Sequence, residues 1–385
     1  MGGPLSEILV VAIEQAVAAP LCTARLADAG ARIIKLERPE GETARHYDNL
    51  VGGTSAYFAW LNRGKESVVV NLKDPGDLSF ARRLIERADI VIQNLAPGAM
   101  GRLGLDSQTL FDERPDMIAV DIVGYNSASS YRSMRAYDML IQAESGICAV
   151  TGTPETPVKV GVSIADICTG MNAYSAILEA VLERSQTGRG KVIEMSMFDG
   201  MADWMSVPLF HYRAGGRVTP RTGLSHATIY PYCAYACCDG EVVVAVQNPS
   251  EWRRFCEGVL ERPDLVEDER FYDNPRRVEN RVALDRIIEN VFKQQDRETV
   301  IARLEAHTLA WGRVSTIEDL AVHPALRSTA IPMPNGRTIT GVASPINPRA
   351  TARPVPALGE HTEAVRQEFA GTATGDGSKR AENYG

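Results

Sequence analysis

Short apolar runs alternate with helix-like segments over the first 125 residues of the chain. The runs are mostly apolar along their whole length, whereas a strand with one face in water alternates apolar and polar residues. They therefore predict an α/β domain, built on a parallel sheet whose two faces are covered by helices. The predicted strands lie at 8–13, 33–36, 66–72, 90–92 and 117–123, and the predicted helices at 20–29 and 78–87.

The rest of the chain divides into three parts that differ in their sequence pattern. The first continues the α/β pattern, with a buried helix at 169–184, a strand at 191–195 and a helix at 198–209, and it closes with a Gly- and Arg-rich linker at 213–223. The second is a compact α+β unit, with strands at 229–236 and 241–247 joined across a hairpin signal, Asp239–Gly240, and helices at 250–260, 280–294 and 297–306. The third, from 324 onward, is Pro-rich and irregular apart from a helix at 364–369.

The amino-acid composition limits which kinds of partner the protein can bind and in which cellular compartment we expect it. The chain has 385 residues, with 49 acidic and 41 basic side chains, so its net charge is −8. Without a basic block, this charge argues against a nucleic-acid partner, and no apolar run reaches the ~20 residues of a membrane span. The seven cysteines follow no secretory signal and lack paired metal-ligand spacing. We therefore expect a cytoplasmic protein with reduced thiols and no metal.

Polar residues stand after several of the predicted strands, namely Gln15, Arg38, Lys73 and Asn94. In an open parallel sheet, ligands bind in the crevice beyond the carboxyl ends of the strands. One such residue is adequately explained as a solvated loop residue, but a set at successive strand ends favours a binding crevice. The first strand is followed by neither GxGxxG nor GxxxxGK[ST], so neither a dinucleotide site nor a P-loop is indicated.

Asp166 is the only charged residue between Lys159 and Glu179. A carboxylate in an apolar stretch must be hydrogen-bonded or have a raised pKa. Two interpretations remain open from the residues alone: Asp166 caps a helix, or it is a catalytic carboxylate that acts as base or nucleophile. No histidine lies near it in the sequence, and nothing indicates a Ser–His or Cys–His dyad.

Several segments resemble the family III CoA-transferases, the CaiB/BaiF group, from about residue 5 to 370. They are QAVAAPLCTARLADAGARIIKLERPEGETAR, LNRGKESVVVNLKDPG, IVIQNLAPGAMGRLGL, AYDMLIQAESG, IADICTG, TGRGKVIEMSMFDG and PALGEHT. The resemblance implies a Rossmann-like large domain, a small α+β domain and an interlocked homodimer. CoA and acyl-CoA would be substrates, with no permanently bound cofactor. The implied boundaries are 1–205 for the large domain, 206–224 for a linker, 225–315 for the small domain, 316–370 for a segment returning to the large domain, and 371–385 for a disordered tail.

The resemblance also assigns roles to matching residues. Asp166 matches the catalytic nucleophile, and Gln15 matches a position near the reacting carbonyl. Arg45 and His46 are candidates for binding a substrate carboxylate, which suits small dicarboxylic acids. Contacts to CoA are implied for Arg38, Leu72, Lys73, Asn94, Leu95, Arg102, Arg135 and Tyr137.

The residue at position 137 distinguishes two activities of the family that the chain resembles. Related acyl-CoA racemases have a catalytic histidine at this position, and a phenol with an ordinary pKa near 10 is a poor replacement for that base. We therefore expect transfer of CoA between an acyl-CoA and a free carboxylic acid. The alternatives are an acyl-CoA racemase and a non-catalytic CoA-binding protein.

Overall fold

The computed structural model describes residues 3–348 and 352–370, and the chain divides into two compact units. The first unit contains the residues up to Ser145, Val160–Met205 and the residues from Arg327 onward. The second contains Gly146–Lys159 and Ser206–Leu326. This division places residues 146–159, the expected linker 206–224 and residues 316–326 in the second unit. The expected disordered tail, 371–385, lies outside the described residues.

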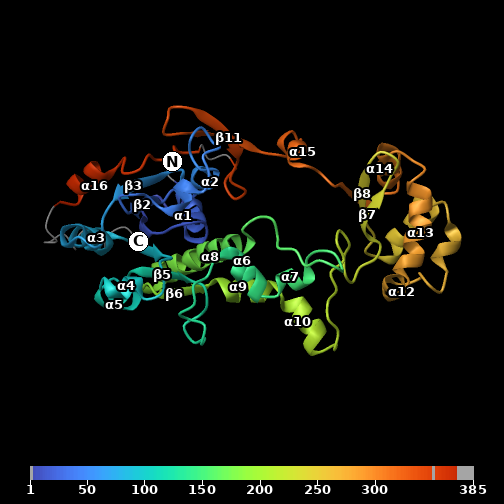
Figure 1. The fold of residues 1–385 in the computed structure, drawn as a ribbon, viewed down its shortest axis with the longest axis horizontal. Coiled ribbons are helices and arrows are strands. Elements are labelled where there is room, and N and C mark those ends of the chain that lie inside the picture. Colours follow the sequence, from blue (N-terminus) through green and yellow to red (C-terminus); the bar gives the residue numbers. More distant parts are fainter. Residues whose placement is uncertain (1–2, 349–351, 371–385) are drawn as a thin grey trace. The chain divides into compact units, whose positions relative to one another are not determined.

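A six-stranded parallel sheet forms the centre of the first unit (Figure 1), so the α/β prediction is confirmed. The spatial order is β3-β2-β1-β4-β5-β6, so the strand order reverses between β1 and β4. In such a sheet the crevice for a ligand opens at the reversal point. The strands are β1 (Leu9–Ile13), β2 (Arg32–Glu37), β3 (Lys65–Val69), β4 (Ile90–Gln93), β5 (Ile118–Val123) and β6 (Val192–Ser196).

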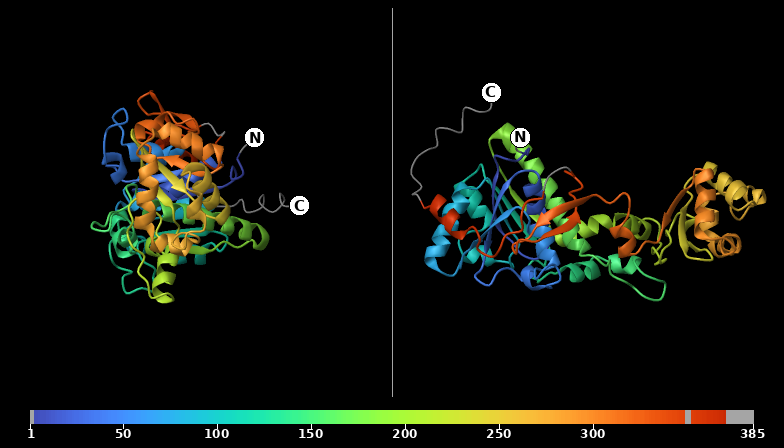
Figure 2. Two further views of the ribbon diagram at one scale, coloured as in Figure 1. Left: turned by 90° about the vertical axis from the view of Figure 1, so that its right-hand side faces the viewer. Right: turned by 90° about the horizontal axis from the view of Figure 1, so that it is seen from above.

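Helices cover both faces of this sheet, as the mostly apolar runs predict. One face packs against α1 (Ala18–Asp28) and α8 (Ile164–Thr187). The other packs against α3 (Pro75–Arg87), α5 (Ser107–Glu113) and α16 (Thr362–Glu368). The C-terminal helix α16 lies beside α3 (Figures 1 and 2), where Arg366 forms a 2.5 Å ion pair with Asp77. The remaining helical segments of this unit are η1 (Thr43–His46), α2 (Ala56–Asn62), α4 (Ala99–Arg102), α6 (Asp138–Glu144) and α9 (Met197–Trp204).

Gly170 brings α8 against α1. A Cβ atom at this position would lie 2.6 Å from the carbonyl oxygen of Ala18 and 3.0 Å from Cβ of Leu21. Only glycine therefore permits the two helices to approach so closely. The contact lies one turn after Asp166, so it sets the distance between the first turn of α8 and the β1–α1 connection.

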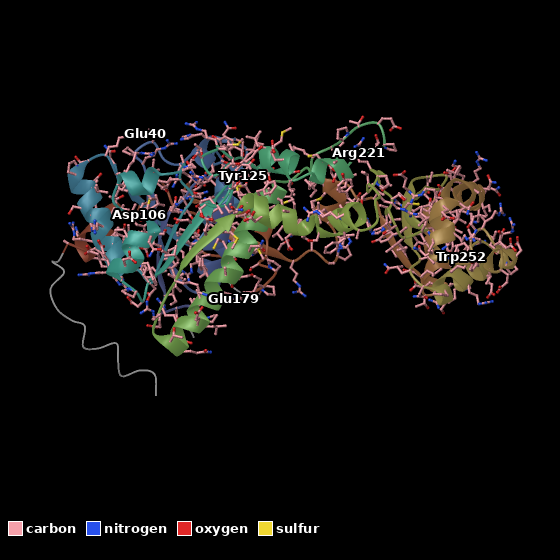
Figure 3. All side chains as sticks on the ribbon, turned by 90° about the horizontal axis from the view of Figure 1, so that it is seen from below. Glu40, Asp106, Tyr125, Glu179, Arg221 and Trp252 are labelled. Atoms are coloured by element: carbon pink, nitrogen blue, oxygen red, sulfur yellow. The ribbon has the colours of Figure 1, made fainter. Side chains whose placement is uncertain are left out.

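The second unit has its own core and its own three-stranded antiparallel sheet, in the order β7-β8-β9. The buried Trp252, labelled in Figure 3, belongs to this core. Arg221 holds the 146–159 segment to this unit through hydrogen bonds to the carbonyls of Thr153 and Pro154 (Figure 3). Its elements are α7 (Ile147–Val150), α10 (Ser206–Arg213), β7 (Tyr232–Ala236), β8 (Glu241–Ala245), α11 (Pro249–Arg254), η2 (Phe255–Val259), η3 (Pro263–Val266), α12 (Asn274–Glu279), α13 (Arg281–Phe292), α14 (Arg297–Ala306), β9 (Ala310–Arg313) and α15 (Ile317–Ala321).

Three element predictions are wrong. The helix expected at 198–209 is divided into α9 and α10, and the one expected at 250–260 continues beyond α11 as a π-helical turn, η2. The segment after residue 324 is not wholly irregular, because β10 (Ser328–Pro332) and β11 (Thr338–Val342) pair as an antiparallel hairpin. The hairpin buries Ile331 and Met333 against Phe58. This packing against residues distant in sequence explains why local patterning did not predict it.

Candidate active site

A cavity of about 650 Å³ opens in the first unit where the strand order reverses. Its walls come from the β1–α1 connection, the segments after β4 and β5, the start of α6 and the first turn of α8. Its lining includes six of the residues predicted from the sequence: Gln15, Asn94, Leu95, Arg135, Tyr137 and Asp166. The lining residues are Gln15, Ala16, Val17, Ala18, Tyr47, Tyr57, Asn94, Leu95, Ala96, Pro97, Ile122, Val123, Gly124, Met134, Arg135, Ala136, Tyr137, Asp138, Met139, Ser163, Asp166 and Met197.

Asp166 is the third residue of α8 and reaches this cavity. Helix α8 begins at Ile164, five residues before the start expected from sequence, so Asp166 is inside the helix and is not its N-cap. Burial, reinforced by the nearby negative charge of Asp138, raises the pKa of Asp166 to about 7. Within the described residues, no group donates a hydrogen bond to its carboxylate. The side chain is therefore poorly solvated and titrates near neutral pH.

Asp138 supplies the cap that α8 lacks. Ser163 occupies the N-cap position without a capping hydrogen bond, and Asp138 Oδ1 accepts hydrogen bonds from the backbone N–H groups of Ala165 (2.8 Å) and Asp166 (3.4 Å). Its other oxygen, Oδ2, accepts from Gln142 Nε2 at 2.8 Å. Asp138 thus fixes the first turn of α8 and places a second negative charge beside Asp166. Sequence reasoning missed this residue, although it directly follows Tyr137.

Gln15 and Asn94 also line the cavity and hydrogen-bond to each other. The backbone N–H of Gln15 donates to Asn94 Oδ1, and Asn94 Nδ2 donates to the carbonyl oxygen of Gln15, both at 2.8 Å. The next residue, Ala16, has φ of 62°, a left-handed conformation that is uncommon for a residue with a side chain. Asn94 therefore uses its amide to hold the connection that carries Gln15.

A second hollow of about 660 Å³ adjoins the cavity and shares Leu95, Ala96, Pro97, Val123 and Arg135 with it. Arginine side chains line it, namely Arg102 and Arg132 together with the shared Arg135. Figure 3 labels Tyr125 and Asp106, which also belong to its wall. Arginines suit the recognition of phosphate groups, because the guanidinium donates in two directions. Sequence analysis named Arg102 and Arg135 but not Arg132.

The remaining predicted residues lie outside both hollows. Arg38 and Lys73 are exposed near the ends of β2 and β3, which are further from the reversal point than β1 and β4, and Leu72 packs against the core. His46 is exposed and contacts the carbonyl oxygen of Glu40 at 3.1 Å.

Arg45 has partners within the fold. It donates two hydrogen bonds of 2.7 Å to the Glu37 carboxylate, and its guanidinium stacks 3.7 Å from the centre of the Phe58 ring. These contacts give Arg45 a structural role, and it is not among the residues that line the cavity. Its expected contact with a substrate carboxylate stays a prediction.

In the described part of the chain, no group of three or more His, Cys, Asp or Glu side chains is placed to hold a metal ion. Over the same residues, every helix is too short or too polar to cross a bilayer.

Comparisons with known proteins agree in one family. The sequence profile of CoA-transferase family III matches residues 5–362. The chain is 32% identical to the succinate–glutarate CoA-transferase of Agrobacterium fabrum, over 95% of this chain and 96% of that relative. It is 32% identical to the acetyl-CoA:oxalate CoA-transferase of Acetobacter aceti, over 96% of each. The crystal structure of a CaiB/BaiF family protein from Brucella suis matches 96% of this chain and 100% of that one, with 33% identity and a TM-score of 0.81. The chain therefore belongs to CoA-transferase family III, and it is an enzyme of the transferase class.

Proposed function

We propose that the protein moves CoA from an acyl-CoA to a free carboxylic acid through covalent intermediates on Asp166. The observation that carries this proposal is the position of the Asp166 carboxylate, which is poorly solvated, without a hydrogen-bond donor among the described residues, and exposed to the cavity. A carboxylate in water is a weak nucleophile because its hydration shell must be removed before it attacks. Here the fold has already removed much of that shell.

The reaction is a chain of acyl exchanges. The Asp166 carboxylate attacks the thioester carbonyl, the C–S bond breaks, and an Asp166–acyl anhydride and a CoA thiolate form. The thiolate attacks Cγ of Asp166, the anhydride C–O bond breaks, and the donor acid leaves as its carboxylate. The acceptor carboxylate then attacks the aspartyl-CoA thioester and releases the thiolate, which attacks the acceptor acyl group and frees Asp166. One thioester replaces another, so no ATP and no net proton are consumed.

The raised pKa of Asp166 determines what fraction of the enzyme can react at a given pH. With a pKa of about 7, Asp166 is partly protonated at neutral pH and becomes a nucleophile only in the ionised fraction. Gln15 lines the same cavity and supports this proposal because its side-chain amide can orient the reacting carbonyl. Tyr137 also lines the cavity, and the described lining residues include no histidine. We therefore assign transfer, and not histidine-dependent proton exchange.

We assign the second hollow to the phosphate-bearing part of CoA. Arg102, Arg132 and Arg135 support this assignment by their charge, and Leu95 lies on the wall shared with the cavity. Asn94 would act on CoA indirectly, since both ends of its amide are occupied by Gln15. We retain the exposed Arg38 and Lys73 as further phosphate contacts at the same edge of the sheet. Leu72 is half-buried in the core beside Lys73, so we propose that it contacts CoA through its backbone.

The proposed substrates are small dicarboxylic acids and their CoA thioesters. Relatives in the comparison are named for succinate with glutarate, for oxalate, and for mesaconate. Arg135 is the cationic side chain among the cavity-lining residues, and Tyr47 and Tyr57 add phenol groups. These groups suit an acyl chain that ends in a second carboxylate.

Intact-mass measurement tests the role of Asp166. Purified protein is incubated with succinyl-CoA in the absence of an acceptor acid and digested to map any adduct. We expect a mass increase equal to CoA minus water on the peptide that contains Asp166, and rapid discharge when glutarate is added. Asp166→Ala and Asp166→Asn should form no adduct and transfer no CoA. Unchanged transfer by either variant, with glutarate, oxalate and mesaconate as acceptors, would refute the proposal.

We also propose that the enzyme is a homodimer. Helix α10 presents Val207, Phe210 and Tyr212 to solvent, with exposed fractions of 59%, 67% and 63%. Exposed apolar side chains concentrated on one helix are typical of a surface that a partner covers. Sedimentation velocity should give a dimer that persists at nanomolar concentration, and a monomer there would contradict an interlocked assembly.

A further inference from the structure

A buried network of four charged side chains lies behind the Gln15 wall of the cavity. The side chains of Glu14, Lys35 and Lys65 are fully buried, and that of Glu42 is 3% exposed. Glu14 Oε1 accepts from Lys65 Nζ at 2.6 Å and from Lys35 Nζ at 3.3 Å. Lys35 Nζ also donates to Glu42 Oε1 at 2.7 Å. The network thus links the end of β1 to β2, β3 and the loop that follows β2.

The charges in the network shift the pKa values of Glu14, Lys35 and Lys65. Burial alone would raise the pKa of Glu14, but Lys65 and Lys35 lower it below its usual value. Burial would likewise depress the pKa of Lys35, but Glu42 and Glu14 raise it. The pKa of Lys65 is lowered by burial to about 8, which leaves it mostly protonated. The network therefore pairs two lysines with two glutamates.

One end of the network contacts the active-site wall. Glu42 Oε2 accepts a 2.7 Å hydrogen bond from the backbone N–H of Ala16. Ala16 is the residue with φ of 62°, and it stands between Gln15 and the start of α1. Asn94 holds the other side of the same connection through the backbone of Gln15. Glu42 and Asn94 therefore clamp an unfavourable backbone conformation from two sides.

Stability alone does not account for such a network. Removing four charges from water is costly, and replacing a buried ion pair with apolar side chains of similar volume is often neutral or stabilising. An anchored carboxylate differs from an apolar side chain in one respect that matters here, since it gives the Ala16 N–H a fixed acceptor.

We propose that Glu42, held by Lys35, is a positioning residue for catalysis: it fixes the Gln15–Ala16 connection so that Gln15 meets the reacting carbonyl. This inference rests on the proposed function, because it takes the cavity of Asp166 as the place of reaction. Neither Glu42 nor Lys35 lines that cavity, so both act through the backbone of Ala16.

Two double variants test the inference, because they remove the same charges and differ only in the acceptor. Lys35→Met with Glu42→Gln keeps an amide oxygen for the Ala16 N–H, whereas Lys35→Met with Glu42→Leu removes it. We expect the Leu variant to have kcat about 10- to 100-fold below that of the Gln variant, with a similar KM for acyl-CoA and a similar thermal midpoint. Hydrogen–deuterium exchange of the peptide spanning residues 13–20 should be faster in the Leu variant alone.

Arg63→Met is the matched control. It also removes a cation from a mostly buried ion pair, with Asp28 at 2.6 Å in the same unit, but Arg63 does not contact the connection. It should leave both kcat and exchange at residues 13–20 unchanged. Equal kcat in the two double variants would overturn the inference. Activity in Asp166→Ala would instead refute the proposed function, and the exchange measurement would still report on the clamp.

Discussion

The Asp166 carboxylate should make the folded enzyme less stable as the pH rises, and Asp166→Asn should abolish this effect. In the unfolded chain the carboxyl group ionises near its ordinary value of 3.8, whereas in the folded protein burial, followed by the charge of Asp138, raises the pKa to about 7. The folded state therefore favours the protonated form. Its stabilising contribution is fully present below the unfolded pKa and is lost as the pH rises through the folded one.

The size of this effect on the free energy of unfolding follows from the two pKa values of Asp166, in the unfolded and the folded state. One pKa unit corresponds to about 1.4 kcal/mol, so the interval from 3.8 to about 7 gives an upper bound of roughly 4 kcal/mol. Water that enters the cavity screens part of this cost, and we expect about 1–3 kcal/mol. The asparagine side chain has nearly the same shape and no charge. The free energy of unfolding of Asp166→Asn, minus that of the wild type, should therefore grow by this amount between about pH 4 and about pH 8.

Thermal unfolding of both proteins across this pH range measures the effect. The two midpoints should diverge as the pH rises, with the variant more stable on the alkaline side. Asp199→Asn is a suitable control, because this carboxylate lies in the same unit outside the cavity and accepts hydrogen bonds from Asn126. A pH-independent difference between wild type and Asp166→Asn would show that Asp166 is not desolvated, and the argument for its reactivity would fail with it.

Three further predictions concern the walls of the site. Asp138→Asn keeps an acceptor for the first turn of α8 and removes the neighbouring charge, so the pKa of Asp166 should fall and the midpoint of the kcat/KM profile should move to lower pH; an unmoved midpoint would contradict this. Asn94→Ala should lower kcat about tenfold or more with little change in the KM for acyl-CoA, whereas an effect on KM alone would mean that Asn94 contacts CoA directly. Arg102→Met should raise the KM for acyl-CoA about tenfold in steady-state kinetics at unchanged kcat, and a loss confined to kcat would exclude a phosphate contact.

Much of the first unit could be predicted because its signals are local. Mostly apolar runs identify buried parallel strands, and the predicted strand at 90–92 differs from β4 by a single residue. The start of α8 was missed because its cap comes from Asp138, which lies 27 residues before Ala165 in the chain. Hairpin β10–β11 was missed for the same reason, since its apolar residues pack against Phe58. Both features depend on tertiary contacts that no local pattern records.

Polar residues after the predicted strands indicated only part of the cavity lining. Gln15, Arg38, Lys73 and Asn94 all follow predicted strands, yet only Gln15 and Asn94 line the cavity. The reason is the order of the strands in the sheet. β1 and β4 are neighbours across the reversal point, whereas β2 and β3 lie progressively further from it. Sequence order gives no indication of this, because the four strands follow one another evenly along the chain.

The buried charges also depend on tertiary contacts that the local sequence does not record. Lys35 interrupts the apolar run of β2, and a lysine there would ordinarily be taken for the solvent-facing residue of an edge strand. β2 is an inner strand, however, and the Lys35 ammonium group is buried with Glu42 and Glu14. A charge inside an otherwise apolar strand therefore indicates a buried partner. Here one partner is Glu42, in the loop after β2, and its carboxylate also accepts from the backbone N–H of Ala16, so the interior of the fold and the wall of the active site are parts of one hydrogen-bonded structure.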